Sequence, residues 1–347
     1  MRPKDFPYFR TLHSLCFRLS GLSGSGLMGD EDYIRIANRI GLDAPVIRKS
    51  LSEDADLEGF NDAGRLVFLE GLARNKCVDI QSLMDGYNSD ADTYCEALIQ
   101  YKKDYAVIDY TDILEKFCSS ELGLPKIKVL IVDEVQDNTV LHWKCISRLI
   151  EAADKVFIAG DDDQAIHTWA GADVNCMLDI EGDVKVLEQS YRVPVKAWDV
   201  ANKVIKQIRG NRQPKLCSPK ADQGRFEYID SLEEVPFEKR IAGESWLLLG
   251  RTQYACKKYF SMFKGLGLDY SDLKEGGLVK ISTIHAAKGS EADNVVILGN
   301  MSRATRNAMD NSDSGFDSEL RVFYTGITRT KNRLWLVDGG YRGFDLW

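Results

Sequence analysis

The chain has 347 residues, of which 44% are hydrophobic and 28% are charged, and its formal net charge is −8. That length allows two domains of ordinary size. No apolar run is long enough to span a bilayer and the start lacks the apolar core of a signal peptide, so we expect a cytoplasmic protein with no membrane partner. The eight cysteines include no C-x-x-C pair, which indicates neither a zinc site nor a disulfide framework.

In the first half of the chain, the pattern of apolar residues predicts helices and two short strands. Residues 11–19 are expected to form a helix capped by Thr11 or Ser14. Residues 30–120 are acidic and helical in pattern, which predicts a helical subdomain. Residues 127–132 and 155–159 are short apolar runs, typical of strands buried on both faces of a parallel sheet, and a helix is expected between them at residues 139–153.

The second half alternates between strands and helices in the same way. Strands are expected at residues 184–188, 246–249, 278–283, 294–298 and 334–337, and helices at residues 193–209, 253–265 and 318–331. This alternation predicts two α/β domains with parallel sheets, divided near residue 185.

The segment from Arg192 to Lys220 is strongly basic. It contains eight lysines and arginines and one acidic residue, Asp199. Because the negative net charge argues against binding nucleic acid by overall attraction, such binding would have to come from a local basic surface of this kind. The alternative is the solvated face of a helix.

Two adjacent carboxylates, Asp133 and Glu134, follow the predicted strand at residues 127–132. The carboxyl ends of strands in an open α/β sheet are where ligands bind. One carboxylate on a magnesium ion and one beside an attacking water would suit a nucleotide-hydrolysing site. Taken alone, the pair is more typical of an acidic turn between a strand and a helix, and the segments that follow reverse that preference.

Five segments carry a resemblance to a known family. They are VDEVQD at residues 132–137, GDDDQAIHTWAGA at 160–172, LEQSYRVP at 187–194, ISTIHAAKGSEADNVVIL at 281–298 and SELRVFYTGITRTKNRLWLV at 318–337. In this order they resemble the motifs of the UvrD/Rep family of superfamily 1 DNA helicases. The resemblance implies two RecA-like domains of the P-loop NTPase type.

The same resemblance implies a domain layout and an activity. Residues 1–125 would hold a helical insertion and flanking segments of an incomplete first domain, residues 126–185 the remainder of that domain, and residues 186–347 the second domain. The implied activity is ATP-dependent translocation 3′ to 5′ on single-stranded DNA, with unwinding at duplex junctions, in repair, recombination or replication. ATP and Mg²⁺ would be the cofactors.

The resemblance also implies roles in ATP binding and hydrolysis for three residues of the first two motifs. Asp133 would hold the magnesium ion, Glu134 would orient or deprotonate the attacking water, and Gln164 would sense the terminal phosphate. For Gln164 the alternative is a surface glutamine in a turn.

Three further residues resemble nucleotide contacts made by the second domain. Arg192 and Arg329 resemble arginine fingers across an interdomain cleft, and Glu291 resembles the acid that reaches the ribose or its phosphates. A surface ion pair is the alternative for each arginine.

Contacts to DNA are implied for five residues. Trp169 resembles the family's base-stacking tryptophan, and Tyr191 would stack on a base or a nucleotide. His13, Thr283 and His285 resemble polar contacts to the strand. Packed core or cap residues are the alternative for all five.

The sequence departs from the family pattern at the first motif, because no G-x-x-x-x-G-K-S/T occurs. We therefore expect an N-terminally truncated helicase that alone binds ATP weakly and hydrolyses little of it. The alternatives are a catalytically incomplete DNA-binding remnant, or one half of a split helicase whose partner polypeptide carries the P-loop.

Overall fold

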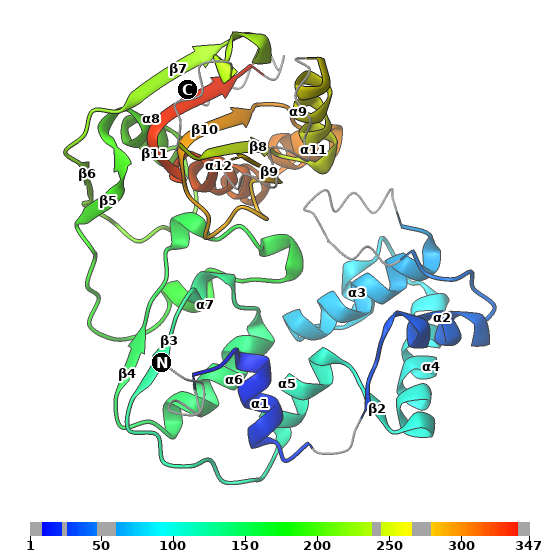
Figure 1. The fold of residues 1–347 in the computed structure, drawn as a ribbon. Coiled ribbons are helices and arrows are strands. Elements are labelled where there is room, and N and C mark those ends of the chain that lie inside the picture. Colours follow the sequence, from blue (N-terminus) through cyan, green and yellow to red (C-terminus); the bar gives the residue numbers. More distant parts are fainter. Residues whose placement is uncertain (1–8, 23–25, 47–59, 238–243, 266–278, 339–347) are drawn as a thin grey trace. The chain divides into compact units, whose positions relative to one another are not determined.

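The computed structural model describes residues 9–22, 26–46, 60–237, 244–265 and 279–338. These residues divide into two compact units (Figure 1). The first contains the described residues up to Asp161 together with His167–Met177. The second contains Asp162–Ile166 and the described residues from Leu178 onward. The middle of the GDDDQAIHTWAGA segment therefore belongs to the second unit, although the residues on both sides of it belong to the first.

The first unit is mainly helical. Its α-helices are α1 (Leu12–Leu19), α2 (Asp30–Arg39), α3 (Asp62–Lys76), α4 (Ser89–Tyr105), α5 (Tyr110–Ser119), α6 (Val140–Glu151) and α7 (Asn175–Leu178), the last ending at the first residue of the second unit. Short 3₁₀ turns are η3 (Ile80–Leu83), η4 (Val135–Asp137) and η6 (Thr168–Ala170), and the strands are β1 (Gly26–Leu27), β2 (Val107–Ile108), β3 (Leu130–Val132) and β4 (Val156–Ile158). Thr11 caps α1, as predicted, through a hydroxyl that accepts from the Ser14 amide.

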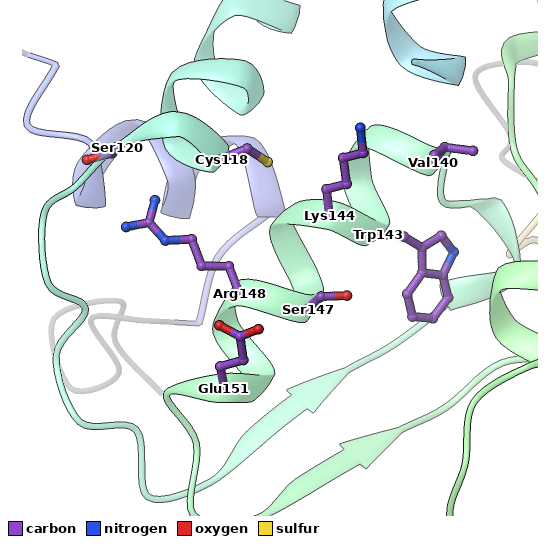
Figure 2. Close-up of a pocket in the computed structure, with 8 residues that line it drawn as sticks. All are labelled: Cys118, Ser120, Val140, Trp143, Lys144, Ser147, Arg148 and Glu151. Atoms are coloured by element: carbon purple, nitrogen blue, oxygen red, sulfur yellow. The ribbon is translucent and has the colours of Figure 1, made fainter. Parts of the chain in front are cut away.

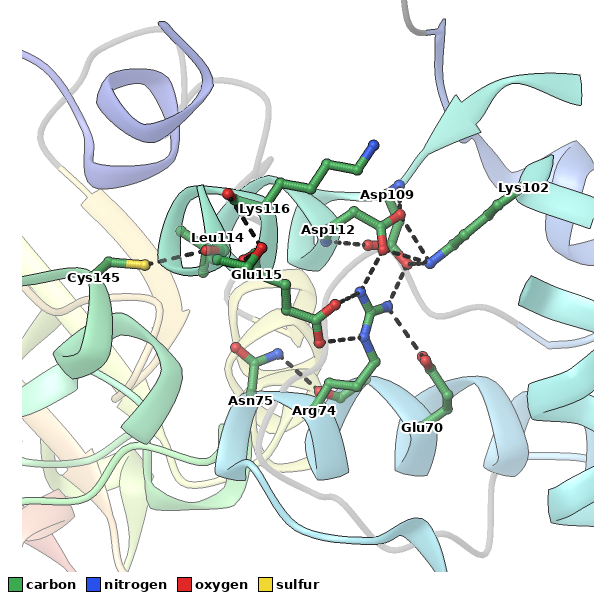
Figure 3. A network of polar contacts seen from close by, with 12 residues as sticks. Glu70, Arg74, Asn75, Lys102, Asp109, Asp112, Leu114, Glu115, Lys116 and Cys145 are labelled. Carbon is green, nitrogen blue, oxygen red and sulfur yellow. Dashed lines mark hydrogen bonds and ion pairs between the residues drawn. The ribbon is translucent and has the colours of Figure 1, made fainter. Parts of the chain in front are cut away.

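Two hydrophobic cores build this unit. One joins α2, α3 and α4, and the other joins α1, α5 and α6 to one face of the β3–β4 pair. Between them lies a network of charges, shown in Figure 3, in which the Arg74 guanidinium contacts four carboxylates at 2.6–3.3 Å. These carboxylates belong to Glu70, Asp109, Asp112 and Glu115. The network fixes α3 against α5.

The β3–β4 pair differs from its prediction. The strands are parallel, as expected, but the prediction that both faces are buried is wrong. Leu130, Val132 and Val156 face the helical core, whereas the cross-strand partners Ile131 and Phe157 are 71% and 59% exposed. Because neighbouring side chains in a strand point to opposite faces, one whole face of this two-stranded sheet is uncovered within the described residues.

The second unit is an α/β layer structure. Its helices are α8 (Val195–Ile205), α9 (Gln253–Gly265), α11 (Arg303–Asn311) and α12 (Asp313–Ile327), with 3₁₀ turns η5 (Asp162–Gln164) and η7 (Leu232–Glu234). Its strands are β5 (Gln189–Pro194), β6 (Ser218–Lys220), β7 (Arg225–Ile229), β8 (Trp246–Gly250), β9 (Val279–Thr283), β10 (Ala292–Leu298) and β11 (Thr330–Val337). Five of the strands form one parallel sheet in the order β7-β11-β10-β8-β9 (Figure 1).

Alternating side chains cover both faces of this sheet. Leu247 and Leu249 of β8 pack in the core that contains α8 and α12, whereas Trp246 and Leu248 pack in the core that contains Tyr259 of α9. The central strands are therefore buried on both sides, as expected for a parallel sheet. The predicted α/β class with parallel sheets and a helical subdomain is confirmed. Within the described residues, no helix is long and apolar enough to cross a membrane.

Two predicted elements of this unit are misplaced. Residues 184–188 form no strand, and Val184 and Leu187 are exposed. The strand in this part of the chain begins at Gln189 instead, as β5, and pairs with β6. The helix predicted at residues 318–331 starts earlier, at Asp313, where the Ser312 hydroxyl caps it. It ends at Ile327 because the chain from Thr330 onward joins the sheet as β11. Leu278, the first residue of another predicted strand, lies outside the described residues.

Candidate functional site

The predicted acidic pair lies in the first unit, directly after β3. Asp133 and Glu134 are both exposed. The Glu134 amide donates to the Asp133 carboxylate at 2.9 Å, and Glu134 has a φ of +52°, in the left-handed region that only glycine adopts without cost. Such backbone conformations in non-glycine residues concentrate at functional sites.

The buried Gln136 side chain stabilises this turn through two hydrogen bonds. Its side chain is fully buried; its amide nitrogen donates to the Glu134 carboxylate at 2.6 Å, and its carbonyl oxygen accepts from the Asp161 amide at 3.1 Å. Gly160 lies against it so closely that an added Cβ would stand 2.7 Å from the same carbonyl oxygen and 2.8 Å from Val135. The ends of β3 and β4 are therefore tied together through one buried glutamine, and position 160 has no room for a side chain.

Gln164 and Arg329 meet directly in the second unit. The Arg329 guanidinium donates to the side-chain oxygen of Gln164 at 2.6 Å and to the Thr325 carbonyl at 2.9 Å. Arg329 is 3% exposed, and the Lys288 ammonium donates to the Gln164 backbone carbonyl at 2.8 Å. The structure thus brings together two residues that the sequence assigned to the same site from motifs far apart in the chain.

Arg192 and Glu291 meet in a second contact of the same unit. The Arg192 guanidinium lies 2.6 Å from the Glu291 carboxylate, whose other oxygen lies 2.5 Å from the Lys331 ammonium. Lys331 and Arg192 together hold the pKa of Glu291 below its usual value, although partial burial opposes them. In this structure Arg192 therefore forms the ion pair that was its alternative prediction.

This pair lies at the edge of an open hollow of about 550 Å³. The lining residues are polar or charged and come from four segments of the unit: Ser190, Tyr191, Arg192, Lys220, Glu291, Asp293, Lys331 and Asn332. Tyr191, one of these lining residues, is 89% exposed. Cationic groups beside an exposed aromatic ring can bind a phosphate-bearing aromatic ligand.

The residues predicted to contact DNA are divided between the units. In the first unit, Trp169 is half-buried, with its ring 6.2 Å from that of His167. His13 lies edge-on to the rings of Tyr110 and His142, and burial lowers its pKa. In this structure each ring has aromatic neighbours, and their roles on DNA stay predictions.

Thr283 and His285 are buried in the second unit. The Thr283 hydroxyl accepts from the Ala286 amide at 3.2 Å, which caps the following turn. His285 forms a hydrogen bond with the backbone of Ile166, and burial lowers its pKa to about 3, so its ring is neutral at physiological pH. Both residues form the packed contacts that were the alternative for them, and their roles on DNA stay predictions.

The basic segment is largely neutralised within the protein. Five of its cationic side chains face a carboxylate at 2.5–3.5 Å: Arg192, Arg209, Arg212, Lys215 and Lys220. Lys203 and Lys206, at the end of α8, are exposed. The charge run visible in the sequence therefore contributes less cationic surface than its composition suggests.

A second hollow of about 550 Å³ lies in the first unit (Figure 2). It is lined by residues of α6, the end of α5 and Ser120, including Trp143, Lys144 and Glu151. It contains none of the predicted site residues.

Comparison with known proteins decides the family. Residues 67–185 match the UvrD/REP helicase N-terminal domain, and residues 260–338 match the UvrD-like helicase C-terminal domain. The chain belongs to the UvrD/Rep helicase family. The matched ranges contain eight of the eleven predicted site residues; Tyr191 and Arg192 fall between the two ranges, and His13 precedes them.

Individual relatives of this UvrD/Rep chain are distant and longer. A probable DNA helicase of Mycoplasma pneumoniae is 25% identical over 78% of this chain and 56% of its own length. The ATP-dependent DNA helicase PcrA of Staphylococcus epidermidis is 24% identical over 74% of this chain and 36% of its own length. PcrA of Bacillus subtilis is 36% identical over 34% of this chain and 17% of its own length. The chain thus spans about half or less of these relatives.

The structure shows three residues in contact with the predicted site residues that the sequence of this UvrD/Rep chain did not single out. Gln136 and Gly160 tie the ends of β3 and β4, and Lys331 shares the Glu291 carboxylate with Arg192. Gly160 had a signal in the sequence, since it lies directly after a predicted strand, where a glycine often marks a close backbone approach. Lys331 was not, because its partner is 40 residues away in the chain.

Proposed function

We propose that this chain is the hydrolytic and DNA-binding part of an ATP-dependent DNA helicase or translocase of the UvrD/Rep type. The observation that carries the proposal is the 2.6 Å contact between Gln164 and Arg329. A glutamine in the turn that follows a strand, bonded to a buried arginine, is suited to respond to a terminal phosphate and to stabilise charge on it.

Asp133 and Glu134 supply the other chemical groups in the proposal. Among the described residues no group of three or more His, Cys, Asp or Glu could hold a metal by itself. Mg²⁺ needs no such group, because it is commonly held by one or two carboxylates together with phosphates and water, and the exposed Asp133 fits that role. When bound, the ion would neutralise charge on the phosphates. Glu134, fixed by Gln136, would orient or deprotonate the attacking water.

The remaining residues would bind the nucleotide and the DNA strand. Arg192 and Arg329 would face the phosphates, Glu291 the ribose, and Tyr191 a base. Trp169 would stack on a base of single-stranded DNA, with His13, Thr283 and His285 as polar neighbours of the strand. The relatives described above are DNA helicases, which supports DNA as the substrate. Movement 3′ to 5′ and a part in repair, recombination or replication belong to the same proposal.

One observation favours a second candidate function, in which the chain works together with another polypeptide. The uncovered face of the β3–β4 sheet presents Ile131 and Phe157, and both strands offer edges for further pairing within the described residues. Two-stranded sheets with an exposed apolar face are marginally stable alone. A polypeptide that brings a P-loop strand could cover this face and supply the phosphate cradle.

ATP hydrolysis and strand polarity test these proposals. Phosphate release would be measured with and without single-stranded DNA, for the chain alone and mixed with a polypeptide that carries a G-x-x-x-x-G-K-S/T segment from a relative. DNA-stimulated release by the chain alone supports a self-sufficient motor, and release only in the mixture supports the two-chain form. Unwinding of duplexes with a 3′ tail but not a 5′ tail would support the polarity. Salt-sensitive DNA binding with no hydrolysis in any mixture would leave only a DNA-binding remnant.

A further inference from the structure

Two buried carboxylates precede Gln164. The side chains of Asp162 and Asp163 are both 0% exposed. Moving a charged carboxylate out of water is costly unless a cation and hydrogen-bond donors replace the water. Their burial therefore depends on the groups that surround them.

Those groups come from one short segment after α8. The Arg212 guanidinium binds Asp163 through two parallel contacts, from Nε to Oδ1 at 2.6 Å and from Nη2 to Oδ2 at 2.8 Å. The Lys215 ammonium lies 2.5 Å from Asp162 and 3.0 Å from Asp163. The Gln213 amide donates to Asp162 at 2.9 Å. Residues 212–215 thus neutralise the acidic pair from one side.

The backbone on both sides of Gln164 is also fixed, by a hydrogen bond before it and by a buried side chain after it. The buried Arg321 guanidinium donates to the Asp162 carbonyl at 2.9 Å. Ile166 is fully buried in the core that contains α8 and α12. Gln164 is therefore fixed before and after its position, which leaves its side chain directed at Arg329.

We propose that Arg212 and Lys215 are positioning residues for the Gln164–Arg329 pair. By neutralising Asp162 and Asp163 they keep residues 162–166 docked in the second unit, so that Gln164 and Arg329 stay preassembled. The inference rests on the proposed function for the roles of Gln164 and Arg329, whereas the docking itself can be measured without nucleotide.

A matched pair in the same unit separates positioning from general stability. Arg251 and Glu319 form another buried two-point ion pair, at 2.7 Å and 2.6 Å, between the end of β8 and α12. Arg251→Gln and Arg212→Gln therefore remove equivalent interactions. Only the second should release the docked segment.

Hydrogen exchange of the full chain tests the docking, read at the peptide that contains the Ala165 amide. Arg212→Gln should speed its exchange by about tenfold or more, and Arg251→Gln should leave it within about twofold. Arg212→Lys keeps the charge but cannot make two parallel contacts, and should give an intermediate rate. The double change Arg212→Gln and Asp163→Asn removes the buried charge with its partner and should restore much of the protection.

Unchanged exchange in the folded Arg212→Gln and Arg212→Lys proteins would overturn the proposal, as would equal acceleration by Arg251→Gln. If Arg212→Gln does not fold, Arg212→Lys and the double variant supply the comparison. In a preparation that hydrolyses ATP, Arg212→Gln should lower kcat by about 10²-fold with little change in KM, as expected for a misplaced group. Absence of nucleotide binding by the unaltered chain, both alone and mixed with the P-loop polypeptide, would instead count against the proposed function and would leave the exchange result standing.

Discussion

The side-chain oxygen of Gln164 accepts a 2.6 Å hydrogen bond from the Arg329 guanidinium, although the two residues are 165 positions apart. Both belong to the second unit, and Arg329 also donates to the Thr325 carbonyl of its own helix. The glutamine of one motif and the arginine of another therefore form one polar group before any ligand is considered.

The coupling between Gln164 and Arg329 should be measurable in a double-mutant cycle. Gln164→Ala and Arg329→Lys each remove the contact, so their combined effect on the free energy of unfolding should fall short of the sum by about 0.5–3 kcal/mol. Arg329→Lys keeps the positive charge but cannot reach Gln164 and Thr325 together. Denaturant unfolding of the four proteins provides the measurement. Additive effects would show that the contact is not maintained in solution.

Gly160 should tolerate no side chain. An alanine Cβ would stand 2.7 Å from the buried Gln136 oxygen and 2.8 Å from Val135, so Gly160→Ala should destabilise the first unit by about 1–3 kcal/mol. Gly182→Ala is the control, because nothing lies within 4 Å of its added Cβ. Thermal unfolding of both variants checks the difference. Equal midpoints would mean that the ends of β3 and β4 are not tied as described.

Trp169 is the residue predicted to stack on DNA. Trp169→Ala should weaken binding of single-stranded DNA by about 1–3 kcal/mol, whereas Trp169→Phe should retain most of the affinity because it keeps an aromatic face. Tyr87→Ala is a matched control, since Tyr87 is an exposed aromatic residue of the same unit without an assigned role. A fluorescence titration with labelled oligonucleotide measures all three. Equal affinities of Trp169→Ala and the unaltered chain would remove Trp169 from the DNA site.

Glu70 should make the first unit less stable as the pH rises. Burial raises the pKa of Glu70 from 4.5 to about 7, while Arg74 and Lys102 oppose that shift. The folded state therefore holds a proton that the unfolded state releases, so stability should fall between about pH 4.5 and pH 7, by roughly 3 kcal/mol at most. Glu70→Gln should flatten this slope, as measured by denaturant unfolding at several pH values. A slope equal to that of the unaltered chain would assign the dependence to other groups.

The sequence predicted much of the fold because its strands are strongly patterned. In β8 and β10 every second residue faces the same core, and α9 begins and ends where its apolar spacing indicated. The pattern of apolar residues gave wrong predictions where strand formation or burial depends on contacts with distant parts of the chain. Leu187 lies in an apolar run yet forms no strand, and Ile131 lies in a strand yet remains exposed, because periodicity cannot reveal which neighbours are present.

The sequence predicted the candidate site residues but not the ion pairs around them. Motif order identified Gln164 and Arg329 but gave no information on the ion pairs that surround them. Arg212 looked like part of a basic surface, whereas its guanidinium binds the buried Asp163. Pairings of this kind join distant positions and leave no periodic signal in the sequence.

In the proposed function, Glu134 and its neighbours hydrolyse ATP in response to DNA. The most direct measurement is phosphate release stimulated by single-stranded DNA, with the P-loop polypeptide present, for the unaltered chain and for Glu134→Gln. The glutamine oxygen can still accept from Gln136, so the fold should be retained. We expect DNA-stimulated release by the unaltered chain and a loss of about 10²-fold or more in the variant. Equal release by both proteins, or none by either, would contradict the account.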